Sequence, residues 1–196
     1  MVTDVSMSRG RRGEILEAAI ELLASGGERA VTYTRIDRAA GAPTGTGSNH
    51  YRSMDKFMWA VCAEVQVRRA VEWNQLLAPA ITGAGVSVGD FAELLANYVT
   101  DACSTHGTSG KLARAHHALM VIAHHRPVLR TPLAEADRKH VALLHDALHA
   151  VNPSASPCDA ELVSTYLYGA IGQQHAIPSA LFNPHTGITA LLTTLT

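Results

Sequence analysis

Hydrophobic residues recur three and four positions apart along most of the chain. The first such stretch covers 14–25, where one face is apolar and the other carries three glutamates. This spacing predicts an amphipathic helix. Gly26 and Gly27 predict its end, because glycine readily adopts the left-handed backbone found at helix termini. Thr32 precedes a second, shorter pattern and is expected to cap it.

The remaining segments repeat the helical pattern, and glycine or proline residues separate them. Pro79 is expected to end the longest of these helices. No stretch shows the clear alternation of apolar and polar residues that is typical of a strand. The sequence therefore predicts an all-α fold of about nine helices with short connections. After 14–25, we expect helices at 33–40, 44–51, 54–78, 87–105, 110–125, 132–151, 158–181 and 185–195.

The stretch GAPTGTGSNHYR at 41–52 combines three glycines with a polar run. A phosphate-binding loop would need a lysine after the glycines, and a dinucleotide loop would need another glycine spacing within a parallel sheet. The sequence meets neither requirement. Two short helices joined by a tight turn are instead the layout of a helix-turn-helix, whose second helix enters the major groove of DNA. The alternative is a plain loop in a helical domain.

Residues 14–57 resemble the N-terminal domain of the TetR family of transcriptional regulators. The positions that match the family pattern are Ala40, Gly41, Gly45, Thr46, His50, Tyr51, Ser53 and Phe57. Four positions depart from it. Asp37 replaces a common alanine, Gly47 replaces an apolar residue, Ser48 replaces a common tyrosine, and Met54 replaces a lysine that often contacts phosphate.

The resemblance implies a DNA-binding helix-turn-helix domain at 1–56 and a ligand-binding and dimerisation domain at 57–196. Residues 1–12 would form an N-terminal arm, whose arginines either reach DNA or belong to a solvated tail. The short helix at 44–51 must be held by packing, and the candidates for this contact are Val31, Ile36 and Tyr51. Absence of a side chain at the glycines would let backbone N–H groups approach a phosphate. We expect DNA contacts from Thr32, Tyr33, Thr34, Thr44, Gly45, Thr46, Ser48, Asn49, His50, Arg52 and Lys56.

The C-terminal two-thirds of the chain would then bind an effector and a second copy. The apolar stretch 159–182, including Leu162 and Ile171, is expected to pair with its symmetry mate as the family does, or to be a core helix. Charged residues are sparse between 112 and 123, which points to an apolar or aromatic effector. The predicted lining residues, each of which would otherwise be core, are Trp59, Trp73, Tyr98, His117, Met120 and Tyr166.

Composition and charge exclude several other classes. The net charge of −1 rules out a polycation, and the three cysteines form no CxxC pair, which suits a reducing cytoplasm. No signal peptide or membrane span is apparent. His145 and His149 share a helix face, but without a third ligand we expect no metal and no cofactor.

We expect a cytoplasmic, homodimeric repressor that binds an inverted-repeat operator and responds to an unknown small molecule, not an enzyme. The alternative is a helical small-molecule-binding or metal-binding protein, or an enzyme, without DNA binding. The long helix at 54–78 would carry movement between the two functions.

Overall fold

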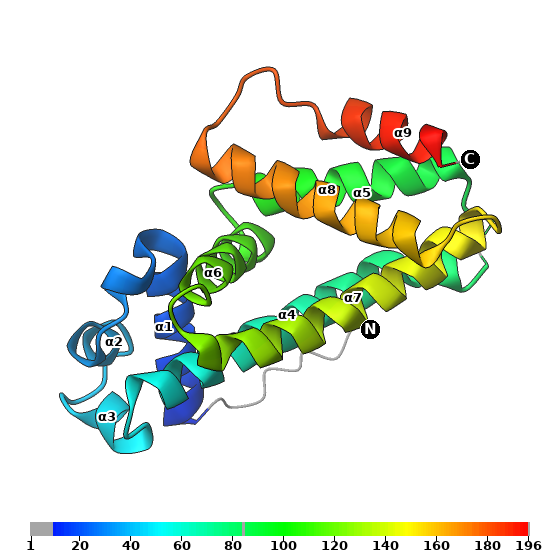
Figure 1. The fold of residues 1–196 in the computed structure, drawn as a ribbon. Coiled ribbons are helices and arrows are strands. Elements are labelled where there is room, and N and C mark those ends of the chain that lie inside the picture. Colours follow the sequence, from blue (N-terminus) through cyan, green and yellow to red (C-terminus); the bar gives the residue numbers. More distant parts are fainter. Residues whose placement is uncertain (1–9, 84, 196) are drawn as a thin grey trace, which may run out of the picture.

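The computed structural model describes residues 10–83 and 85–195, and within them it contains nine α-helices and no strand. Two short 3-10 turns, η1 (Glu28–Ala30) and η2 (Pro127–Leu129), connect helices. The all-α prediction is therefore confirmed (Figure 1). The α-helices are α1 (Arg11–Gly26), α2 (Tyr33–Ala39), α3 (Thr46–His50), α4 (Met54–Ile81), α5 (Val88–Cys103), α6 (Thr108–Ile122), α7 (Arg130–Val151), α8 (Pro157–Ala176) and α9 (Pro184–Thr194).

Polar side chains fix several helix starts. The hydroxyl of Thr32 accepts the backbone N–H of Arg35, which confirms the predicted cap of α2. Ser87 and Ser156 each form a reciprocal capping box with an aspartate three residues later. These caps satisfy backbone groups that a helix terminus leaves without an internal partner.

Several predicted boundaries were wrong. Pro79 does not end α4, which continues to Ile81 and stops before Gly83, where φ is +73°. The helix predicted at 158–181 ends at Ala176, because Pro178 disfavours helical backbone at the residue before it. The helix α3 has only five residues, since Gly45 takes a left-handed conformation and becomes its N-cap.

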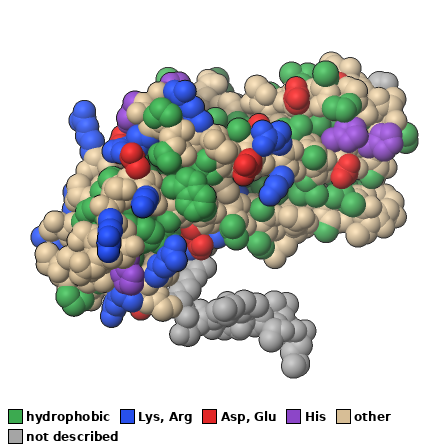
Figure 2. Space-filling model, turned by 60° about the horizontal axis from the view of Figure 1, so that its bottom comes forward, with side chains coloured by type: hydrophobic (Ala, Val, Ile, Leu, Met, Phe, Trp, Pro, Cys, Tyr) green, Lys and Arg blue, Asp and Glu red, His purple; other side chains and the backbone are tan. Residues whose placement is uncertain are grey.

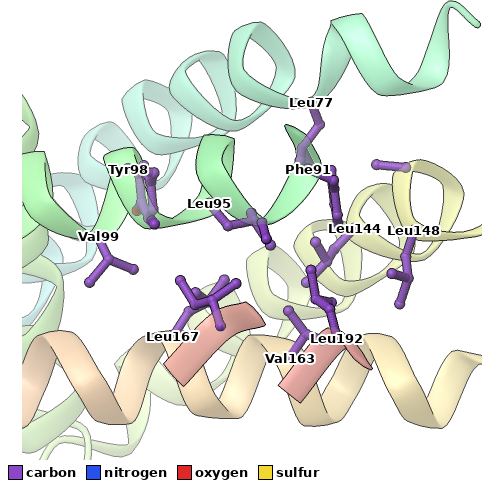
Figure 3. Packing of buried hydrophobic residues seen from close by; sticks show 14 of the residues in the cluster. Leu77, Phe91, Leu95, Tyr98, Val99, Leu144, Leu148, Val163, Leu167 and Leu192 are labelled. Carbon is purple, nitrogen blue, oxygen red and sulfur yellow. The ribbon is translucent and has the colours of Figure 1, made fainter. Parts of the chain in front are cut away.

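Two apolar cores lie at opposite ends of the molecule. One core joins α5, α7, α8 and α9 to the end of α4, with Leu95, Leu144 and Leu167 among its buried residues (Figure 3). The other joins α1, α2 and the start of α4, and it contains Val31, Ile36 and Tyr51 as predicted. Residues 57–65 of α4 belong to the second core and its later residues to the first, so α4 runs from one to the other.

The helix α6 packs mainly with the N-terminal core. Its Leu112, Leu119 and Ile122 are buried in that core, and α6 makes extensive contacts with α1. In Figure 1, α6 lies between α1 and the group formed by α5 and α8. The predicted division at residue 56 stays a prediction, and it falls within the first turn of α4.

Candidate functional site

The segment joining α2 to α3 is a tight turn that depends on glycine. Gly41 and Gly45 have φ values of +59° and +95°, in the region that favours glycine. Between them, the N–H of Ala42 donates to the carbonyl oxygen of Asp37 at 2.8 Å. The two short helices therefore meet across a compact connection, and the packing of α2 against α3 confirms the layout expected for residues 33–50.

The carboxylate of Asp37 holds the start of α3. It accepts the backbone N–H of Gly45 at 2.7 Å with one oxygen and that of Gly47 at 2.7 Å with the other, and its residue is only 2 % exposed. An added Cβ at Gly47 would lie 3.1 Å from this carboxylate and 3.1 Å from the Tyr33 ring. The departures from the family pattern at positions 37 and 47 therefore form one structural unit, which we call the Asp37 clip.

The Asp37 clip changes the role expected for the glycines. We predicted that their backbone N–H groups would approach a DNA phosphate, but the N–H groups of Gly45 and Gly47 donate to Asp37. That prediction was wrong for these two groups, because an internal carboxylate occupies them. Sequence reasoning noted Asp37 only as a departure. An acidic residue eight positions before a glycine-rich helix start was the signal that it missed.

Aromatic residues hold the other end of α3. The hydroxyl of Tyr33 donates to the carbonyl oxygen of Tyr51 at 2.7 Å, and Arg12 Nε donates to the hydroxyl of Tyr51 at 2.8 Å. The rings of Tyr33 and Tyr51 both pack on Phe57, with centroid separations of 5.8 and 4.9 Å. Arg12 lies in the first turn of α1, so the part of the predicted arm at residues 11 and 12 is helical. Residues 1–9 of that arm lie outside the described residues.

The predicted DNA-contacting side chains differ in whether they already make a hydrogen bond within the protein. The side chains of Thr32, Tyr33, Thr46 and Ser48 each make a hydrogen bond inside the protein. Predicted residues that are exposed and make no side-chain hydrogen bond among those described are Thr34, Thr44, Asn49, His50, Arg52 and Lys56. Exposed arginines at 35 and 38 on α2 lie on the same unit, and sequence reasoning missed them because it considered only the start of α2. Figure 2 shows Lys and Arg side chains gathered over the end of the molecule that holds α1–α3.

A cavity of about 1410 Å³ lies between α6, α7 and α8, and α4 contributes one residue to its wall. His117 and Met120 line it, as predicted. Its apolar wall includes Leu133, Val141 and Ile171. A volume of this size is sufficient for a drug-sized organic molecule.

Four aromatic residues predicted for this cavity lie elsewhere. Trp59 is 48 % exposed beside His50 and Lys56, next to the short helix α3. Trp73 and Tyr98 are packed against each other in the C-terminal core, 4.4 Å between ring centroids (Figure 3 labels Tyr98). Tyr166 packs on Gly187 of α9. The sequence does not fix which side of a helix faces the cavity, and these four rings lie on other sides.

The cavity wall contains a buried polar cluster. Arg69 of α4 is 5 % exposed, and its Nη2 donates to the hydroxyl of Tyr168 at 3.3 Å. His116 stacks on the Tyr168 ring, and its Nδ1 lies 3.1 Å from the Gln66 side-chain nitrogen. His140 packs behind, between Tyr168 and Trp73. Burial and the charge of Arg69 lower the pKa of His116 and bring that of His140 to about 3, so both rings are neutral at pH 7.

Residues 86–196 match the family model described as the tetracyclin repressor-like, C-terminal domain. This match covers more than half of the chain. The chain belongs to the TetR family of transcriptional regulators. It is thus a ligand-responsive regulator of transcription, and regulators of this family are in general DNA-binding proteins without enzymatic activity.

Solved structures of TetR-family regulators share the fold. The reduced form of NemR from E. coli superimposes with a TM-score of 0.75 at 18 % identity, over 94 % of this chain and 97 % of NemR. A regulator from Rhodococcus sp. gives 0.72 at 18 %, over 94 % and 97 %. The multidrug binding protein EbrR complexed with ethidium gives 0.70 at 21 %, over 96 % and 99 %. No curated protein sequence matches the chain.

In this TetR-family protein, ion pairs bind the segment that follows α6 to η1 and to the start of α4. Arg126, which lies between α6 and η2, binds Glu28 at 2.5 Å and also Asp55 in the first turn of α4. His125 binds the other oxygen of Glu28 at 2.6 Å. Burial would raise the pKa of Glu28, but hydrogen bonds from Arg126 and His125 outweigh it and lower the pKa. We call Arg126, Glu28 and Asp55 the Arg126 latch.

Two other sequence predictions concern metal and membrane. His145 and His149 stack on each other on α7, but within residues 10–83 and 85–195 no three His, Cys, Asp or Glu side chains gather as a metal site would require. Among the same residues, no helix has the length and apolar character needed to cross a bilayer. The three cysteines are free.

Proposed function

We propose that this TetR-family protein is a homodimeric repressor that binds an inverted-repeat operator and leaves it when a small molecule enters the cavity. The observation that carries the proposal is the Asp37 clip, which fixes a polar α3 near the start of the chain, while a large cavity lies between α6, α7 and α8. Two helices, α4 and α6, join these regions.

The charge around α3 supports DNA binding. Between residues 29 and 56, the basic residues are exposed, whereas Asp37 is buried and Asp55 is paired with Arg126. The basic residues are Arg29, Arg35, Arg38, Arg52 and Lys56. A face of this kind attracts the DNA backbone. The exposed amide of Asn49 can then accept from and donate to an adenine edge.

Replacing Asn49 and Arg52 separately tests these roles. Asn49→Ala should cost about 1–3 kcal/mol of operator binding and relax the preference at one operator position, because a base contact is lost. Arg52→Ala should weaken binding to all sequences alike and make the salt dependence shallower, because a phosphate contact is lost. Binding titrations against a set of operator variants at several salt concentrations measure both. If both substitutions relax the same base preference, the assigned roles are wrong.

Helix α8 supports dimerisation, but not through every residue we expected. Leu162, Gly169 and Gln173 are exposed on it and recur at helical spacing. Ile171 is 5 % exposed and packs in the C-terminal core, so its predicted place in a dimer interface was wrong. The face that includes Leu162 remains available for a second copy.

The cavity and the Arg126 latch support an effector response. The helix α6 lines the cavity with His116, His117 and Met120, and the segment that directly follows α6 is bound to η1 and α4 by the latch. A ligand that shifts α6 would therefore move the start of α4 relative to α1, and with it the spacing of the two α3 helices in a dimer. The ethidium-bound EbrR structure provides a precedent for a ligand in this fold.

Removing the latch tests this route. Arg126→Ala should leave the affinity of a cavity-binding compound unchanged but reduce, by several-fold, the factor by which that compound weakens operator binding. Because the latch residues are partly exposed, we expect at most about 1 kcal/mol of lost stability. Paired DNA-binding titrations with and without the compound measure the factor. Lys139→Ala, on an exposed position of α7, is the control, and an unchanged factor in Arg126→Ala would exclude the latch.

Selection of bound sequences from a random DNA library tests the proposed function as a whole. The purified protein should enrich an inverted repeat, because a two-fold dimer presents two copies of α3. Compounds that raise the melting temperature of the free protein should then release it from that sequence. A selection without enrichment, or one that returns a single half-site, contradicts the proposal. Stabilising compounds that all leave operator affinity unchanged contradict the effector part.

A further inference from the structure

Arg69 lies in an unusual environment for a charged residue. It is the α4 residue that lines the cavity, and it is 5 % exposed. Its guanidinium lies 5.3 Å from the centroid of the Tyr168 ring and makes one hydrogen bond, at 3.3 Å to the Tyr168 hydroxyl. A guanidinium has five N–H donors. Most of its hydrogen-bonding capacity is therefore not used by the described part of the protein.

No carboxylate among residues 10–83 and 85–195 forms an ion pair with Arg69. Glu72 lies one turn along α4, and burial raises its pKa, although a hydrogen bond from Ser109 and then the charge of Arg69 act to lower it. The carboxylate of Glu72 accepts a hydrogen bond from Ser109 instead. A buried charge without a partner is costly, and proteins ordinarily pair it.

The groups around Arg69 do not cancel its charge. Burial, then the charge of Arg69, lowers the pKa of His116 and of His140, so both rings are neutral. Burial raises the pKa of the Tyr168 hydroxyl, although Arg69 opposes this, so the phenol is also neutral. This wall of the cavity therefore carries one positive charge among neutral donors, and Ser164 adds a buried hydroxyl to the lining.

The acidic residues of the cavity belong to its exposed part. Asp137, Asp146 and Glu161 are exposed, and so are the arginines at 130 and 138 that share the lining with them. The exposed part is therefore mixed in charge, whereas the deeply buried charge is a single guanidinium.

We infer that the effector of this cavity carries a carboxylate on an apolar or aromatic body, and that the guanidinium of Arg69 binds that carboxylate; the inference rests on the proposed effector role of the cavity. A guanidinium and a carboxylate match in geometry and form two parallel hydrogen bonds. The apolar side chains of Leu133, Val141 and Ile171 would contact the body of the molecule. An organic cation, the class to which ethidium belongs, would be repelled by Arg69 if it entered this part of the cavity. It could pair only with the exposed carboxylates.

Three fluorescent probes with the same apolar body and different charges test the inference. They are 1-pyrenebutyrate, the neutral 1-pyrenebutanol and a trimethylammonium derivative of the same pyrenebutyl chain. The full chain, without DNA, should bind the carboxylate most tightly in a fluorescence titration. In Arg69→Met, which keeps an unbranched stem but lacks the guanidinium, the preference for the carboxylate over the alcohol should fall by about ten- to a hundredfold. Arg138→Met, at an exposed position of the same cavity, should retain the preference.

The comparison of the three probes on the unmodified protein does not depend on the folding of any variant. Tighter binding of the cation, equal binding of all three, no binding of any, or an unchanged preference in Arg69→Met each overturns the carboxylate assignment. Operator release is measured separately. If the carboxylate probe binds through Arg69 but never releases DNA, the proposed switch fails and the ligand class stands. If only a cation releases DNA, the switch stands and the ligand class fails.

Discussion

Replacing Asp37 with alanine is expected to lower the free energy of unfolding by about 2–4 kcal/mol. Each of the two hydrogen bonds to the buried carboxylate contributes about 1.5–3 kcal/mol. Part of this loss is offset, because the unfavourable burial of the carboxylate is also removed. The N–H groups of Gly45 and Gly47 would lose the acceptor that holds the start of α3. A five-residue helix has little stability of its own. Operator affinity should therefore fall more than tenfold. Thermal or chemical unfolding and a DNA titration measure the two effects.

Substitution of Gly47 provides a sharp control for the Asp37 clip. Gly47→Ala in the unmodified protein adds a Cβ at 3.1 Å from the Asp37 carboxylate and from the Tyr33 ring. In an Asp37→Ala background one of these two contacts is gone, so the same change should cost less. The double-mutant cycle should thus show a coupling between positions 37 and 47. Strictly additive losses would mean that the clip does not act as one unit.

Replacing Leu162 with glutamate should convert the dimer to a monomer and weaken operator binding by at least about a hundredfold. Two linked half-sites bind far more tightly than one, commonly by a factor of about 10²–10⁴. Leu162 is 49 % exposed, so the substitution should spare the core of the protomer, unlike a change at the buried Ile171. Mass measurement in solution and a DNA titration give both outcomes.

A matched control for this prediction is Val71→Glu, on α4. Val71 is 51 % exposed, close to the value for Leu162, but it does not lie on α8. It should remain dimeric and bind DNA normally. A Leu162→Glu protein that is folded, dimeric and active on the operator would move the interface away from this face of α8.

The sequence was sufficient for the helical fold and for the turn between α2 and α3, because periodic apolar residues and glycines act locally. It was insufficient for the cavity. Which side of a helix an aromatic residue faces depends on packing with distant helices, so Trp73 was predicted as lining although it is core. Arg69 was missed for the same reason, since an arginine on a long helix ordinarily faces solvent. The sequence also did not show that the departures at Asp37 and Gly47 belong together, because only the fold brings the Asp37 carboxylate to the backbone N–H of Gly47.

The contribution of α6 to the N-terminal core bears on how regulators of this kind can be recombined. A chimera that joined the first helices of this protein to the effector-binding part of another regulator would lose Leu112, Leu119 and Ile122 from beneath α1. It would also lose Lys111, which binds Glu17 of α1 at 2.6 Å. The DNA-reading part is thus completed by α6, which follows only after α4 and α5 in the chain. The transferable unit is α1 to α4 together with a matching α6, and exchange of sensors among such proteins must preserve that pairing.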